Sequence, residues 1–124
     1  MRERIAQASV DSTVASARED LLRRAGYNVR TFAACGELMF ACMNQQFDLL
    51  IVGQSLAENV REQMRAAFRK FNAGAPIVQI IRSNESAGGA DFAFNIEQEP
   101  TELMHLLAKI LDETDLEKSA RTGD

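Results

Sequence analysis

The stretch that most constrains the fold runs from Phe47 to Gly53 and reads Phe-Asp-Leu-Leu-Ile-Val-Gly. The apolar residues from Leu49 to Val52 are continuous rather than alternating, which is the pattern of a strand covered by helices on both faces. In folds built from such strands, ligands and chemistry lie at the carboxyl ends of the strands. Gly53 stands at that end and offers no side chain that could coordinate a metal or attack a phosphoryl group.

Strand and helix patterns alternate along most of the chain. Strands are predicted at 4–9, 27–32, 49–52, 77–81 and 92–96, and helices at 14–25, 35–45, 58–71 and 100–111. This alternation implies right-handed crossovers and a parallel sheet of five strands with helices on both faces. We therefore predict a flavodoxin-like three-layer α/β/α fold with strand order 2-1-3-4-5.

Signals for helix ends support this reading. Asp11, Ser12 or Thr13 can cap the first helix, and Gly26 supplies the left-handed residue that ends it. Pro100 opens the last helix, whose apolar stripe ends at Leu111. We expect one domain over residues 1–111, followed by a polar C-terminal tail, 112–124, with a frayed end.

Composition and charge narrow the function. A chain of 124 residues with 46% hydrophobic and 26% charged residues suits a single globular domain. No apolar run approaches the length of a membrane span, and the start, Met1 to Ile5, lacks the apolar core of a signal peptide, so we expect a cytoplasmic protein that does not bind membranes.

Charge is unevenly placed along the chain. Residues 83–124 carry ten acidic and three basic residues, a net −7, so residues 1–82 carry +3 of the total −4. The acidic third argues against direct nucleic-acid binding and favours a basic protein partner. Arg61, Arg65 and Arg69 recur every four residues and predict an exposed arginine ridge, which could pair with the acidic third of a second copy.

The cysteines and the single histidine do not indicate a metal site. Cys35 and Cys42 lie two helical turns apart, too far for a disulfide, and too few other ligands accompany them for zinc. Cys35 and Cys42 are therefore expected to be buried and reduced, and His105 to be an exposed residue of the last helix. We expect no cofactor and no enzymatic activity.

Four segments together resemble the receiver domain of two-component response regulators, over about residues 4–111. These segments are Leu-Leu-Arg-Arg-Ala-Gly-Tyr-Asn-Val at 21–29, Phe-Asp-Leu-Leu-Ile-Val at 47–52, Pro-Ile-Val at 76–78 and Gly-Ala-Asp at 89–91. Receivers carry an acidic pair that binds magnesium, a phosphoacceptor aspartate, a Thr or Ser, and a lysine, each just after a strand.

Laid on this sequence, those roles fall on residues without the required groups. The acidic pair falls on Ser9 and Val10, the phosphoacceptor on Gly53, the hydroxyl position on Ile81, and the lysine on Ile96 or a neighbour. Magnesium prefers carboxylate oxygens, and only Asp11 is nearby, which is better explained as a helix cap. Asp48 lies at the other end of its strand.

The resemblance also predicts a changed interaction surface. Between Ile81 and Ile96 the chain is too short for a full crossover helix, so the receiver's fourth helix is predicted to be shortened or absent, with a groove beside the fifth strand. The candidate interaction surface comprises Arg82, Asn84, Glu85, Asp91, Glu102, His105, Lys109 and Glu113.

Three functions remain open at this stage. The first is a phosphorylation-independent protein-interaction module in signal transduction, with a protein partner of unknown identity. The second is a structural module that forms homodimers. The third is a small-molecule or anion-binding domain, using the polar residues expected at the carboxyl ends of the strands: Ser9, Asp11, Ser12, Gln54, Ser55, Arg82 and Ser83.

Overall fold

The computed structural model describes residues 3–122, with side chains described as far as Glu113. Its elements are β1 (Arg4–Ala8), α1 (Ser12–Arg24), β2 (Asn28–Phe32), α2 (Cys35–Asn44), β3 (Leu49–Val52), α3 (Glu58–Phe71), β4 (Ile77–Ile81), β5 (Phe92–Asn95) and α4 (Pro100–Thr122). All neighbouring strands are parallel, in the order β2-β1-β3-β4-β5. The predicted fold and strand order are confirmed.

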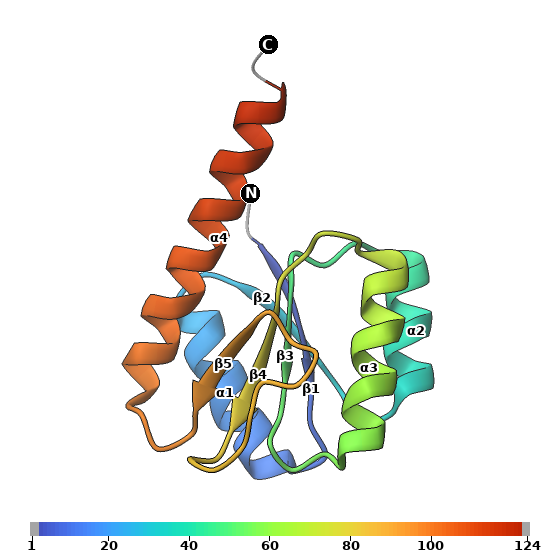
Figure 1. The fold of residues 1–124 in the computed structure, drawn as a ribbon, viewed down its shortest axis with the longest axis vertical. Helices are drawn as coiled ribbons and strands as arrows, with labels where there is room; N and C mark the ends of the chain where they lie inside the picture. The colour runs from blue at the N-terminus through green and yellow to red at the C-terminus, as the bar shows by residue number, and fades with distance from the viewer. Residues whose placement is uncertain (1–2, 123–124) are drawn as a thin grey trace.

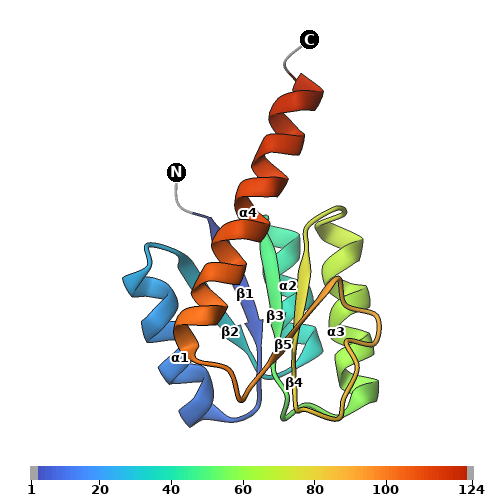
Figure 2. The same cartoon turned by 60° about the vertical axis from the view of Figure 1, so that its left-hand side comes forward.

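The sheet lies between two helical layers, with α2 and α3 on one face and α1 and α4 on the other (Figures 1 and 2). Central strand β3 supplies both cores because its side chains alternate: Leu50 and Val52 join the cluster under α2 and α3, whereas Leu49 and Ile51 join the one under α1 and α4. These β3 residues are completely buried, which explains the continuous apolar run.

The ends of α1 follow the predicted signals. Asp11 caps the helix, since its side chain accepts hydrogen bonds from the amides of Thr13 and Val14. Gly26 has φ of +98° and its amide donates to the Arg23 carbonyl, so the left-handed stop is also confirmed. These local devices fix the path of the chain from β1 to β2.

Two parts of the structure differ from the predictions. Helix α4 continues to Thr122, so the polar segment expected to fray is helical that far and stands away from the body of the domain (Figures 1 and 2); residues 123–124 lie outside the described residues. The apolar sequence of the predicted helix 35–45 makes Phe40 and Met43 available to pack, yet they are 70% and 66% exposed. Both project from the outer side of a short helix whose inner side already buries Leu38, Ala41 and Cys42.

The connection between β4 and β5 contains no helix, as predicted. We call this connection, residues 82–91, the β4–β5 segment; it lies against α3 and returns the chain to β5 at the edge of the sheet. Helix α4 therefore takes the place of a receiver's fifth helix. Among residues 3–122, no helix is long and apolar enough to cross a membrane.

Candidate functional site

The receiver's functional positions lie at the carboxyl edge of the sheet and fall into two neighbouring pairs. Ser9 and Gly53 are adjacent, because the Gly53 amide donates to the carbonyl of Ala8 at 2.8 Å. Ile81 and Ile96 are adjacent in the same way, through a 2.8 Å bond from the Ile96 amide to the Ile81 carbonyl. The four residues to which the resemblance assigns receiver roles therefore lie at the same edge of the sheet.

Gly53 lies where a side chain would make tight contacts. A Cβ added there would lie 3.0 Å from the Ala8 carbonyl oxygen and 3.4 Å from both Cβ and Oγ of Ser9. The carbonyl is fixed because it accepts the Gly53 amide, and Ser9 is itself buried. Any side chain at this position would therefore press against the backbone of β1.

Nearby carboxylates are committed to the backbone. Asp11 Oδ1 accepts from the amides of Thr13 at 3.1 Å and Val14 at 3.2 Å. Asp48 Oδ2 accepts from the Arg4 amide at 2.8 Å, at the amino edge of the sheet as predicted. Among the described residues, no cluster of three or more His, Cys, Asp or Glu side chains has the spacing of a metal site.

The predicted arginine ridge is wrong as an exposed feature. Arg61 and Arg65 are only 6% and 4% exposed, and only Arg69 lies on the surface. Arg61 pairs with Glu85 at 3.1 Å and Arg69 with Asp91 at 3.6 Å, both in the acidic third of the same chain, whereas Arg65 pairs with Glu58 of α3 itself. The β4–β5 segment therefore lies over the guanidinium groups of α3.

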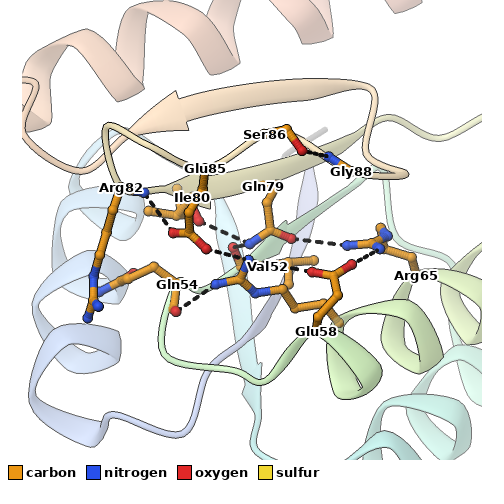
Figure 3. A network of polar contacts seen from close by, with 11 residues as sticks. Val52, Gln54, Glu58, Arg65, Gln79, Ile80, Arg82, Glu85, Ser86 and Gly88 are labelled. Carbon is orange, nitrogen blue, oxygen red and sulfur yellow. Dashed lines mark hydrogen bonds and ion pairs between the residues drawn. The ribbon is translucent and has the colours of Figure 1, made fainter.

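Arg61 joins three parts of the edge, and its partners Gln54 and Glu85 are labelled in Figure 3. Its Nη2 donates to the Gln54 carbonyl at 2.7 Å, directly after Gly53, and its Nη1 donates to Glu85. Glu85 also accepts from the Arg82 amide at 2.9 Å. The Arg82 amide and, to a smaller degree, Arg61 hold the pKa of the Glu85 carboxyl below its usual range.

Arg65 satisfies a polar group inside the sheet (Figure 3). Its Nη1 donates to Gln79 Oε1 at 3.2 Å, and its Nη2 donates to Glu58 at 2.9 Å. Gln79 is 1% exposed and its amide nitrogen donates to the carbonyls of Val52 and Ile80. Because the guanidinium also lies against Gly89, a Cβ there would meet Arg65 Nε at 3.2 Å. The glycine lets the segment approach the arginine closely.

The predicted interaction residues are all exposed but lie in two places. Four are in the β4–β5 segment, on the α3 face, and four are on α4, on the opposite face: Arg82, Asn84, Glu85 and Asp91, then Glu102, His105, Lys109 and Glu113. Edge strand β5 lies between the two groups. Asp91 and Glu113 come together, since both line a cavity of about 460 Å³ beside the start of β5.

The buried network was missed, although the sequence carries a signal for it. Gln79 interrupts the apolar strand Ile-Val-Gln-Ile-Ile, and a buried amide needs hydrogen-bond partners. Arg65 lies on the preceding helix and supplies one of them. Both cysteines are free, as predicted. Cys42 is buried as predicted, whereas Cys35 is partly exposed.

Comparison with solved structures gives the fold class. A CheY-like receiver domain protein from Methanospirillum hungatei superposes with a TM-score of 0.80 at 22% identity, over 94% of this chain and 99% of that one. CheY4, a chemotaxis protein of Vibrio cholerae, gives 0.77 at 18% identity, over 89% and 99%. The receiver domain of Francisella response regulator 1452 gives 0.76 at 13%, over 91% and 99%. The chain thus has the fold of response-regulator receiver domains. No protein-family model and no curated protein sequence matches it.

Proposed function

We propose that this protein is a phosphorylation-independent protein-interaction module in signal transduction, a receiver scaffold without the phosphoryl switch. The observation that carries the proposal is that Gly53, which has no side chain, stands where the resemblance places the phosphoacceptor, and that a Cβ there would make a tight contact of 3.0 Å with the Ala8 carbonyl oxygen. The receiver fold supports the signalling context, and it supports a role in binding because receivers act through surfaces beside their fifth strand.

The arginine network supports an interaction surface that is held in place. Arg61 and Arg69 tie the β4–β5 segment to α3 through Glu85 and the Gly89 carbonyl. We propose that the partner binds around β5, contacting Asn84 on one side and His105 on the other. A charged surface of both signs suits a polar protein partner.

The switch is tested with a phosphodonor. Incubation with acetyl phosphate and Mg²⁺ should leave the intact mass unchanged, and beryllofluoride with Mg²⁺ should leave the NMR amide signals of Asp11, Gly53 and Ser83 in place. A phosphoryl mass gain, or joint movement of these signals, would contradict the proposal. A receiver that retains its aspartate is the positive control.

The interaction surface is tested separately by photo-crosslinking in the native cytoplasm. A crosslinker at Asn84 or His105 should capture one protein repeatedly, and the same group at Arg24, an exposed residue of α1, should not. Capture from Arg24 alone would place the interface elsewhere.

Self-association is a second candidate, favoured by Phe40 and Met43. These side chains are exposed one turn apart on α2, and apolar contact with a second copy would bury both. Light scattering should then give a dimer that Phe40→Glu converts to a monomer. A concentration-independent monomer in the unaltered protein would exclude this function.

A further inference from the structure

A cleft between α1 and α4 contains a buried arginine that has no carboxylate partner among the described residues. The cleft has a volume of about 160 Å³ and is lined by Val14, Leu21, Ile80, Phe94 and Leu103, with Arg18 among them. Its walls are therefore mainly aliphatic and aromatic. It lies on the opposite face of the sheet from the arginine network, near the ends of β4 and β5.

Arg18 is unusual because its charge is buried but uncompensated. The residue is 8% exposed, and its one hydrogen bond runs from Nη1 to Gln7 Oε1 at 2.8 Å. Among the described residues, no carboxylate lies within ion-pair distance of it, although Arg23, Arg61, Arg65 and Arg69 all have one. Burial alone lowers the pKa of the Arg18 guanidinium. Burying a charge in this way is costly unless an anion accompanies it.

The surrounding hydrogen bonds fix the arginine in place. Gln7 Nε2 donates to the Ala15 carbonyl at 3.2 Å and to Thr31 Oγ1 at 2.9 Å, which turns the Gln7 oxygen toward Arg18. The nearest acid in this chain of bonds is Glu19, and it is occupied by the Thr31 hydroxyl at 2.7 Å and by Arg23 at 3.8 Å. The remaining guanidinium donors, Nε and Nη2, have no partner among the described residues.

We propose that this cleft binds a small aliphatic carboxylate, with Arg18 as its counter-ion. A guanidinium recognises a carboxylate through two parallel N–H···O bonds, and the apolar walls suit a short hydrocarbon chain. At about 30 Å³ for each water-sized group, the volume holds about five groups, enough for the carbon chain of a five-carbon acid whose two carboxylate oxygens lie at the Arg18 guanidinium. The carboxylate would neutralise the charge that the fold leaves buried.

Titration of the full chain with sodium pentanoate, followed by NMR, tests the proposal. We expect saturable shifts of the Ala17, Phe94 and Leu103 amides with Kd of about 1 mM or tighter. Pentanamide, which has the same shape without the charge, should bind about 10- to 100-fold more weakly. Absence of saturable shifts up to about 10 mM pentanoate, or equal binding of the amide, would overturn the proposal.

Three variants distinguish the contribution of the Arg18 charge to binding from that of the space in the cleft. Arg18→Met removes the charge and should abolish the preference for pentanoate over pentanamide. Ala17→Leu fills the cleft from an exposed position of α1 and should block binding while Arg18 remains. Arg24→Met, an exposed arginine of the same helix, should bind as the unaltered protein does. Unchanged pentanoate binding by Ala17→Leu would refute the assignment even if Arg18→Met fails to fold.

Discussion

Gly53→Ala should destabilise the protein, although alanine is the smallest side chain that can replace glycine. The new Cβ would lie 3.0 Å from the Ala8 carbonyl oxygen, and overpacking of this kind costs about 1–3 kcal/mol. Alanine also restricts the unfolded chain more than glycine does, which raises the unfolding free energy by about 0.4–1 kcal/mol. The net loss of unfolding free energy is therefore about 1–2 kcal/mol, or about 4–8 °C in Tm for a chain of this size.

Gly53→Asp should cost more, because it adds a buried carboxylate without a partner. The additional loss is about 2 kcal/mol or more. Urea unfolding followed by far-UV circular dichroism measures both variants, since the chain has no Trp and one Tyr. Gly36→Ala is the matched control: a Cβ there meets nothing within 4 Å, and it should stabilise helix α2 by about 0.5–1 kcal/mol.

Unfolding of Gly53→Ala at the same urea concentration as the unaltered protein, or at a higher one, would contradict the tight contact at Gly53. A stable Gly53→Asp variant that binds beryllofluoride would also contradict the proposed function, because the site would then tolerate a phosphoacceptor.

Three further predictions concern the buried groups. Arg65→Met should lower the unfolding free energy by about 1–3 kcal/mol, because Gln79 Oε1 loses its donor; a change below about 0.5 kcal/mol in urea unfolding would contradict this. Glu85→Gln should be less stable than the unaltered protein at neutral pH, and the difference should narrow as pH falls below 4.5, the ordinary pKa of this group, since a lowered folded-state pKa stabilises only the ionised form; a constant difference would refute the pairing. Iodoacetamide should modify Cys35 faster than Cys42, whose thiol has its pKa raised by burial, as peptide mass spectrometry would detect; equal rates would argue against that burial.

The fold could be predicted because its determinants are local. The apolar run of β3, the Asp11 cap and the Gly26 stop each act within a few residues, and right-handed crossovers then leave few strand orders, of which the flavodoxin-like one is observed. The place of Gly53 at the carboxyl end of β3 could also be predicted, because the end of the apolar run is clear from the sequence.

Packing partners across the domain were harder to predict. Spacing put Arg61 and Arg65 on one face of α3, but spacing does not say whether a helix, a loop or water covers that face. Long aliphatic stems let arginine line a buried surface while its head finds polar partners, here Glu85 and Gln79. The lack of space at Gly53 depends on the register of β1 against β3, which only the structure supplies.

The β4–β5 segment is held over α3 by charged and polar groups rather than by a packed helix. A crossover helix packed by leucines cannot leave its sheet without exposing apolar surface that aggregates. The β4–β5 segment is held mainly by Arg61, Arg65 and Arg69, and these groups are readily hydrated when they separate from their partners. Because ion pairs weaken as the Debye length shrinks, we expect high ionic strength to loosen the contact between this segment and α3.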